Sequence, residues 1–256
     1  MSVHLGINEE ELKRIKKWFR GYVDSFNTET PLFRENIKLK DAHTLRVCDE
    51  ILTIGRELGL SDDELRLAEI IALLHDVGRF EQFARYGTFN DTKSENHAEL
   101  GIKIIDREAV LDQLEDNIKE LIVKSIRYHN MVSLPDNEDE TCLFYSKLLR
   151  DADKLDIWSI VTEYYHRKDG KKNSGLELEL PDTPGFSESV GDDLANKRSV
   201  NFKNIHNLND FKLLQAGWIF DINYEPSREI VRERRYLEKI RAALPKSEEI
   251  DEIFPL

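Results

Sequence analysis

An apolar run that ends in two polar side chains constrains the fold of this chain more than any other feature. Residues 68–74 read Ala-Glu-Ile-Ile-Ala-Leu-Leu, and His75 and Asp76 follow directly. Such a run is expected inside a protein, where an imidazole and a carboxylate are costly unless other groups pair with them. The capping box at residues 61–64 predicts a helix that runs into this pair, and Gly78 is expected to end it. The fold must therefore supply partners to both side chains.

Helical spacing of apolar residues recurs along most of the chain and predicts an all-α fold. It predicts helices over residues 9–26, 36–58, 94–105, 116–128, 141–165 and, with a break near Pro226, 210–244. Residues 79–93 and 131–140 are expected to be loops. Residues 176–180 alternate in polarity, which indicates a short strand or hairpin arm.

The length and the pattern together predict a single domain over residues 1–256. Its helical core is expected at about 36–160, followed by an irregular insertion at 166–209 and closing helices at 210–256. The insertion could form a lid or an oligomer contact, and a surface excursion without a role is an equal alternative. No feature indicates an oligomeric state.

Charge and cysteine usage narrow the partners and the compartment. The formal net charge of −13 argues against binding to nucleic-acid polymers or anionic membranes, although a nucleotide-sized ligand remains compatible. Cys48 and Cys142 show no disulfide pattern and fit a reducing compartment. The sequence shows no signal peptide and no apolar segment of membrane-spanning length. We therefore expect a cytoplasmic protein.

Histidines and aspartates lie on the apolar faces of five predicted helices. A single histidine on such a face is more often a hydrogen-bonded core residue than a metal ligand. Several imidazoles and carboxylates that converge in one interior would repel or stay unsatisfied without a cation, which favours a metal centre. Because thiolates are lacking, the set suits Mn, Fe, Co, Ni or Zn better than Ca. The candidates are His43, His75, Asp76, His97, His129 and Asp153.

The ordered set His43, His75-Asp76 and Asp153 resembles the HD superfamily of metal-dependent phosphohydrolases over roughly residues 36–160. The stretch Arg-Asp-Ala-Asp-Lys-Leu-Asp offers three aspartates for the last position. The family's Ala-Asp-x-Leu context selects Asp153, and the helical stripe independently prefers Asp153 to Asp151. With His97 and His129 added, the order H, HD, H, H, D resembles the two-metal members.

The resemblance implies an HD-domain helical bundle that holds two divalent ions, drawn from Mn, Fe, Co, Ni, Mg or Zn. One ion would take His43, His75, Asp76 and Asp153, and the other would take His97 and His129. Asp76 would bridge the two ions and is therefore the expected catalytic residue. Two such ions would hold a hydroxide and clamp the oxygens of a phosphoryl group.

Phosphate chemistry also needs cations and supporting carboxylates. Arg79 and Lys93 are expected to contact the substrate phosphate or the leaving group, although each alone is more often a solvated surface charge. Glu81, Gln82 and Asp156 are expected to accept hydrogen bonds from ligating histidines. Ser94 is a candidate cap for the helix that contains His97.

Three functions remain open. The leading one is hydrolysis of a nucleotide or another small phosphate ester, so the expected partner is a small phosphorylated substrate. The chain lacks the Gly-Tyr-Pro signature of cyclic-dinucleotide phosphodiesterases. Directly after His75-Asp76 it also lacks the Glu-Asp pair that is typical of alarmone hydrolases. Mixed-valent di-iron oxygenases use the same ligand order and are the alternative. The third possibility is a non-catalytic, metal-bound module that senses a ligand.

Overall fold

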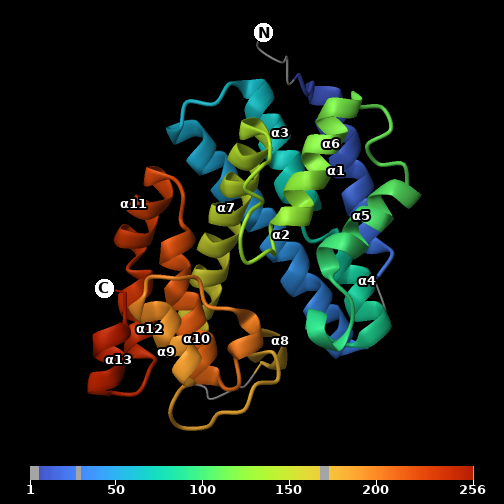
Figure 1. Cartoon of the computed structure of the whole chain (residues 1–256). Coiled ribbons are helices and arrows are strands. Elements are labelled where there is room, and N and C mark those ends of the chain that lie inside the picture. Colours follow the sequence, from blue (N-terminus) through green and yellow to red (C-terminus); the bar gives the residue numbers. More distant parts are fainter. Residues whose placement is uncertain (1–5, 27–29, 168–172, 256) are drawn as a thin grey trace. The chain divides into compact units, whose positions relative to one another are not determined.

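The structure is a computed structural model that describes residues 6–26, 30–167 and 173–255. Within these ranges every regular element is a helix, and no strand occurs (Figure 1). The all-α prediction is therefore confirmed. Clustering of contacts divides the chain into two compact units, residues 1–153 and 154–256. The prediction of a single domain over the whole chain stays a prediction.

The first unit contains the helices that carry the candidate metal ligands. Its elements are α1 (Glu9–Asp24), α2 (Pro31–Glu57), α3 (Asp62–Leu74), α4 (Val77–Tyr86), the short 3-10 helix η1 (Asp91–Lys93), α5 (His97–Arg107), α6 (Asp116–Tyr128) and the first part of α7 (Glu140–Tyr165). Helix α3 packs against α1, α2 and α6. Its segment from Ile70 to Leu74 is buried throughout, so the apolar run forms the centre of this unit as expected.

Local sequence explains how α3 begins and ends. The Ser61 hydroxyl accepts a hydrogen bond from the Glu64 backbone N–H, and the Glu64 carboxylate accepts one from the Ser61 N–H, which confirms the capping box. The helix ends at Leu74, and Asp76 has φ −106° and ψ 13°, outside helical geometry. A new helix then begins at Val77. The polar pair therefore lies in the link between two helices.

The loop predicted over residues 79–93 is wrong in its first half, where the structure has α4. Val77, Phe80 and Gln82 turn a buried face toward the unit, so the aromatic residues there belong to an amphipathic helix. Gly87, with φ 67°, ends it in the left-handed conformation that favours glycine.

Gly78 does not end α3 but lies in the first turn of α4, at the contact with α5. A Cβ at this position would lie 2.6 Å from the Gly101 backbone nitrogen and would overlap the His97 carbonyl oxygen. Glycine is therefore required because α4 and α5 approach each other closely at this point. The contact also holds the start of α5, and with it His97, beside Asp76.

The second unit contains the end of α7 and a set of shorter helices. These are α8 (Ser174–Glu177), α9 (Glu188–Ala195), η2 (Phe202–Asn204), α10 (Leu208–Gly217), η3 (Trp218–Asp221), α11 (Glu225–Arg234), α12 (Tyr236–Ala242) and α13 (Glu248–Ile253). Trp158 is fully buried at its centre and donates a hydrogen bond of 2.9 Å to the Gln215 carbonyl. The predicted insertion at 166–209 is thus partly helical where it is described.

The strand predicted over residues 176–180 is wrong. The Asn173 side chain accepts hydrogen bonds from the backbone of Gly175 and Leu176, which starts the single turn of α8. Leu178 and Glu179 then have φ of 51° and 58°. Left-handed backbone cannot continue an extended strand, so alternating polarity was misleading here.

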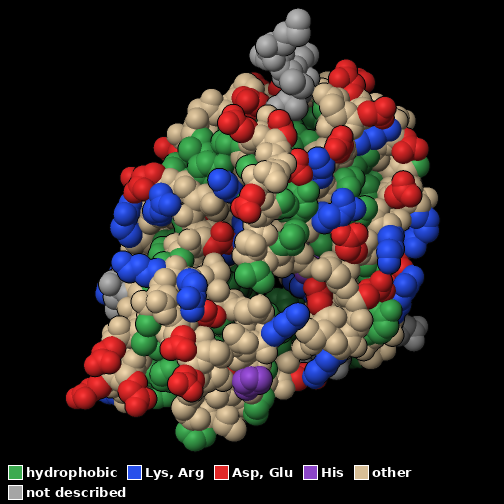
Figure 2. Space-filling model, in the orientation of Figure 1, with side chains coloured by type: hydrophobic (Ala, Val, Ile, Leu, Met, Phe, Trp, Pro, Cys, Tyr) green, Lys and Arg blue, Asp and Glu red, His purple; other side chains and the backbone are tan. Residues whose placement is uncertain are grey.

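No helix in the described part of the chain is both long enough and apolar enough to cross a membrane. Basic and acidic side chains are interspersed over the face shown in Figure 2.

Candidate metal centre

The structure brings the six candidate ligands together inside the first unit. They come from separate elements and meet around the link between α3 and α4. Five of them are buried, and the Asp153 side chain retains 18% of its exposure. The set consists of His43 on α2, His75 and Asp76 in the link, His97 at the start of α5, His129 at the end of α6, and Asp153 on α7.

The two carboxylate oxygens of Asp76 face two different pairs of histidines. Its Oδ2 lies 3.5 Å from His43 Nε2 and 3.7 Å from His75 Nε2. Its Oδ1 lies 3.4 Å from His97 Nε2 and 3.9 Å from His129 Nε2. A single carboxylate between two imidazole pairs is the arrangement that a bridging ligand requires.

Asp153 completes the group on the Oδ2 side of Asp76. Its Oδ1 lies 3.2 Å from His43 Nε2 and 3.8 Å from His75 Nε2. The first group thus comprises His43, His75, Asp153 and the Asp76 Oδ2 atom, and the second group comprises His97, His129 and the Asp76 Oδ1 atom. His75, His129 and Asp153 also offer atoms within 4.8 Å of one another, so the two groups adjoin.

Hydrogen bonds at Nδ1 determine which nitrogen of each ring points into the centre. His75 Nδ1 lies 2.6 Å from the Ala72 carbonyl oxygen, and His129 Nδ1 lies 2.6 Å from the Ile126 carbonyl oxygen. A carbonyl oxygen only accepts, so both rings donate from Nδ1 and leave a lone pair at Nε2. Both Nε2 atoms are thus prepared as ligands.

The donor set fits a cation better than it fits a hydrogen-bonded core. His97 Nε2 and His129 Nε2 are 2.9 Å apart, and His75 Nε2 is buried with no hydrogen-bond partner among the described residues. Burial lowers the pKa of His75 and His97, and burial together with the neighbouring imidazoles lowers the pKa of His129 to about 3. At neutral pH these rings are neutral, so facing lone pairs need a cation between them.

The Asp76 carboxylate is ionised in this environment. Burial raises the pKa of its side chain, but nearby positive charge, including the Lys40 ammonium and the Arg79 guanidinium, holds that pKa well below its usual range. Neutral imidazoles and ionised carboxylates are the protonation states in which these groups bind metal ions.

Asp91 supports His97 and was not predicted from the sequence. Its Oδ2 lies 2.7 Å from His97 Nδ1, and its Oδ1 accepts hydrogen bonds of 2.8 Å from Arg79 and Gln82. Asp91 lies in η1, where no helical periodicity marks it, six residues before the histidine that it contacts. It orients the His97 ring and makes its Nε2 more basic.

Replacing Asp91 with Ala should weaken binding at the second group by about 10- to 100-fold, because the His97 ring loses the acceptor that orients it. Affinity at the first group should change little. Calorimetric titration with Mn²⁺ checks this, with Asp112→Ala, an exposed aspartate of the same unit, as the control. Equal losses at both groups would contradict a role confined to His97.

Arg150 is a second supporting residue that periodicity did not reveal. It is 4% exposed on α7, one turn before Asp153. Its Nη1 donates to the carbonyl oxygens of Tyr128 and His129 at 3.1 and 3.2 Å, and to that of Met131 at 2.5 Å. A guanidinium at these carbonyls satisfies the end of α6 and ties His129 to the helix that carries Asp153.

The two predicted phosphate contacts lie differently. The Arg79 guanidinium pairs with Asp91, and its Nε lies 3.6 Å from Asp76 Oδ1, so it is at the edge of the second group. Lys93 lies exposed in η1. Contact of either side chain with a substrate phosphate stays a prediction.

Two predicted supporting roles change, and a third stays untested. Glu81 pairs with Arg107 at 3.1 Å and with Arg85. The carboxylate that accepts a hydrogen bond from a candidate ligand histidine is therefore Asp91, and not Glu81. The cap of α5 is Asn96, which accepts a hydrogen bond of 3.1 Å from the Glu99 N–H, and not Ser94. Asp156 is buried in the second unit, and its role at the centre stays a prediction.

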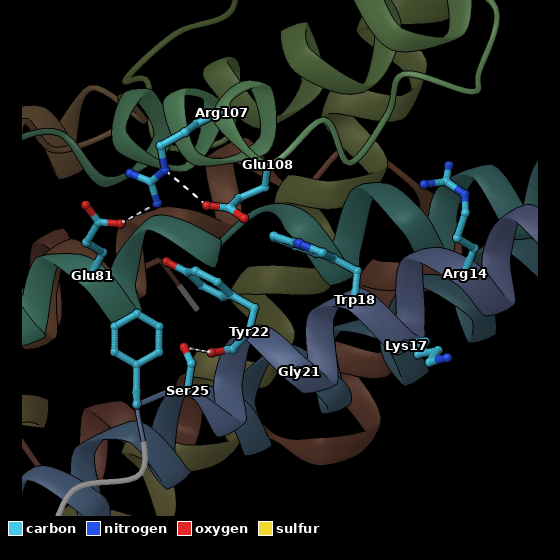
Figure 3. A pocket seen from close by; sticks show the side chains of 10 residues that line it. Arg14, Lys17, Trp18, Gly21, Tyr22, Ser25, Glu81, Arg107 and Glu108 are labelled. Atoms are coloured by element: carbon cyan, nitrogen blue, oxygen red, sulfur yellow. Dashed lines mark hydrogen bonds and ion pairs between the residues drawn. The ribbon is translucent and has the colours of Figure 1, made fainter.

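Glu81 belongs to a separate groove on the first unit (Figure 3). The groove has a volume of about 730 Å³ and lies between α1 and the Arg107–Glu108 corner, with Trp18 and Tyr22 along one wall. None of the six candidate ligands lines it. Glu81 therefore faces this groove and not the candidate metal centre.

Acid should destabilise the metal-free protein through His129. Its pKa is about 3 in the folded chain and about 6.5 when unperturbed, so below pH 6.5 the unfolded state binds more protons. The stabilisation is present above pH 6.5 and is lost as the pH falls toward 3. Urea unfolding in the presence of a chelator at several pH values should show this loss. The free energy of unfolding should fall less steeply with decreasing pH in His129→Gln than in the wild type. Identical slopes would contradict it.

Comparison with known proteins agrees with this geometry. The family model for the HD domain matches residues 41–158, which include all six candidate ligands. HD domains bind divalent metal ions and occur in a superfamily of metal-dependent hydrolases. The comparison with curated proteins gives no match, and the comparison with solved structures gives none either.

Proposed function

Because residues 41–158 of the chain form an HD domain, we propose that the protein is a metal-dependent phosphohydrolase that acts on a nucleotide or another small phosphate ester. The observation that carries the proposal is the position of Asp76, with one carboxylate oxygen toward each histidine pair. This supports two cations that share one carboxylate.

The first group would hold one ion, and the second group would hold the other. Two divalent ions held by these groups would supply a nucleophile from water at neutral pH and would neutralise the oxygens of a phosphoryl group. Asp76 holds both positions together, while Asp91 and the carbonyls of Ala72 and Ile126 keep the imidazole lone pairs directed inward.

Side-chain cations near the second group would bind the phosphate of the substrate. We assign the Arg79 side chain, whose Nε lies 3.6 Å from Asp76 Oδ1, the binding of a phosphate oxygen that would enter beside that carboxylate. We assign Lys93 the same role from its place in η1, close in sequence to Asp91. The net charge of −13 supports a small phosphorylated substrate over a nucleic-acid polymer.

Metal analysis followed by a phosphate-release screen tests this proposal. Freshly purified protein should contain about two divalent ions per chain, as expected for a two-metal site. Protein reloaded with Mn, Co, Ni or Mg should release phosphate from at least one ester in a panel of nucleotides and sugar phosphates. Asp112→Ala should behave as the wild type.

Two outcomes would count against the proposal. Two irons per chain with substrate-dependent oxygen uptake, and no phosphate release, would favour the di-iron oxygenase alternative. Bound metal without any turnover, together with saturable binding of a small ligand, would favour a non-catalytic sensing module.

A further inference from the structure

Lys40 contacts the candidate metal centre although the sequence pattern did not single it out. It lies on α2, three residues before His43, and its side chain retains 18% of its exposure. Its Nζ lies 2.9 Å from Asp76 Oδ2. The ammonium therefore lies against the Asp76 oxygen that faces His43 and His75.

The charges of the first group show what this ammonium does. Two ionised carboxylates, Asp76 and Asp153, lie there beside two imidazoles. Two negative charges in a buried space repel and need positive charge close by. Lys40 supplies one positive charge directly at Asp76 Oδ2, so without a metal ion it is the counter-ion of this group.

A divalent ion would need the same oxygen. With the ion bound to Oδ2, the two negative charges of the group are balanced, and an ammonium on the same oxygen adds repulsion between neighbouring positive charges. The ammonium also occupies a lone pair that the ion would use. Pairing of Lys40 with Asp76 and binding of an ion to Asp76 Oδ2 therefore oppose each other.

In its contact with Asp76, the ammonium also lies beside an aromatic ring that can keep it at the site once that contact is lost. Its Nζ lies 5.5 Å from the centroid of the Phe89 ring, a distance that allows a cation–π contact. Phe89 also contacts Arg79, because the Arg79 Nη1 donates a hydrogen bond to the Phe89 carbonyl oxygen. A displaced Lys40 would stay beside Phe89, near the Arg79 guanidinium.

We propose that Lys40 is an exchangeable counter-ion, which a metal ion displaces from Asp76 when the first group is filled and which then binds a phosphate oxygen of the substrate. The binding of phosphate by the displaced Lys40 rests on the proposed function. The exchange between Lys40 and the metal ion concerns metal binding alone. Lys40 thus lowers the affinity of the first group for its metal ion. When that ion binds, the Lys40 ammonium is released from Asp76 and becomes able to bind phosphate.

Replacing Lys40 with Met tests the exchange. Titration with Mn²⁺, followed by calorimetry, should show affinity at the first group raised about 10-fold or more, with a smaller change at the second. The matched control is Lys38→Met, which removes the same charge from an exposed position two residues earlier on α2. Its affinities should stay within twofold of the wild type. An affinity in Lys40→Met that is unchanged or lower would overturn the proposal.

Thermal unfolding separates this role from general damage to the fold. In a chelator, Lys40→Met should unfold at a lower temperature than Lys38→Met, because the buried Asp76 carboxylate loses its counter-ion. Mn²⁺ should then raise the unfolding temperature of Lys40→Met by more than it raises that of the wild type. Equal shifts in both proteins would overturn the exchange. If Lys40→Met does not fold, Lys40→Gln carries the same expectations, while Lys40→Arg keeps the charge and should retain the low wild-type affinity.

Binding of inorganic phosphate tests whether the displaced Lys40 contacts a phosphate oxygen. The affinity of phosphate for the Mn²⁺-loaded protein should fall about 10-fold in Lys40→Met and stay unchanged in Lys38→Met. An unchanged phosphate affinity would overturn the assignment of Lys40 to phosphate. None of these measurements requires turnover, so a wild-type protein that binds Mn²⁺ but hydrolyses no ester would refute the proposed function alone.

Discussion

Replacement of Asp76 with Asn is expected to remove both metal ions from the protein and to lower phosphate-ester hydrolysis by about 1,000-fold or more. A neutral amide cannot place one anionic oxygen against each histidine pair, as Asp76 does with Oδ2 near His43 and Oδ1 near His97. Mutation of a residue that only supports a metal ligand typically reduces metal affinity by about 10- to 100-fold. Loss of Asp76, which would contact both ions, should reduce the affinity of both groups by more than this. The loss of rate corresponds to several kcal/mol of charge stabilisation in the transition state.

Metal content measured after dialysis, together with the phosphate-release rate, checks this result. Two variants provide matched comparisons. Asp153→Asn should lose mainly the first ion, because Asp153 Oδ1 faces His43 and His75, whereas His97→Gln should lose mainly the second. Retention of one ion at wild-type affinity in Asp76→Asn would show that Asp76 does not bridge.

Replacement of Gly78 with Ala is expected to destabilise the protein by about 3 kcal/mol, a large effect for the addition of one methyl group. The new Cβ would meet backbone atoms of α5 at His97 and Gly101, and a backbone cannot rotate away as a side chain can. The helices α4 and α5 must separate, which also moves His97 away from Asp76. Binding at the second group should therefore weaken together with stability.

Urea unfolding in the presence of a chelator measures the stability change, and Mn²⁺ titration measures the second effect. The control is Gly21→Ala in α1, where an added Cβ meets nothing within 4 Å. This change should stabilise the protein by about 0.5–1 kcal/mol, because alanine favours a helix over glycine. A loss below about 1 kcal/mol in Gly78→Ala would contradict the close helix contact.

The prediction of the fold from the sequence succeeded where the pattern is local and long. Apolar residues marked α1, α2, α3, α6 and α7 close to their observed bounds, because each of these helices buries apolar side chains over several turns. It failed over residues 79–93, where the ten-residue helix α4 follows the polar link with little room for periodicity. It also failed at α8, where side-chain hydrogen bonds from Asn173 decide the backbone.

The prediction of the site had the same strengths and gaps. The six candidate ligands were found because each ends or lines an apolar stripe, and the structure brings them together. Lys40, Asp91 and Arg150 were missed because their importance comes from partners distant in sequence. Asp91 lies outside any regular stripe, and Lys40 and Arg150 lie one turn before ligands on long helices, where a cation is usually a surface residue.

The sequence by itself determined the helical class and the chemical types of the candidate ligands, because helix periodicity and side-chain chemistry are properties of short segments. Only the tertiary structure decided how these candidate ligands are arranged. The close approach of α4 and α5 at Gly78 sets His97 beside Asp76, and the link after α3 turns one oxygen of Asp76 toward each histidine pair. It also showed that Lys40 already contacts one of those oxygens. Such relations depend on the packing of distant segments, which no local pattern encodes.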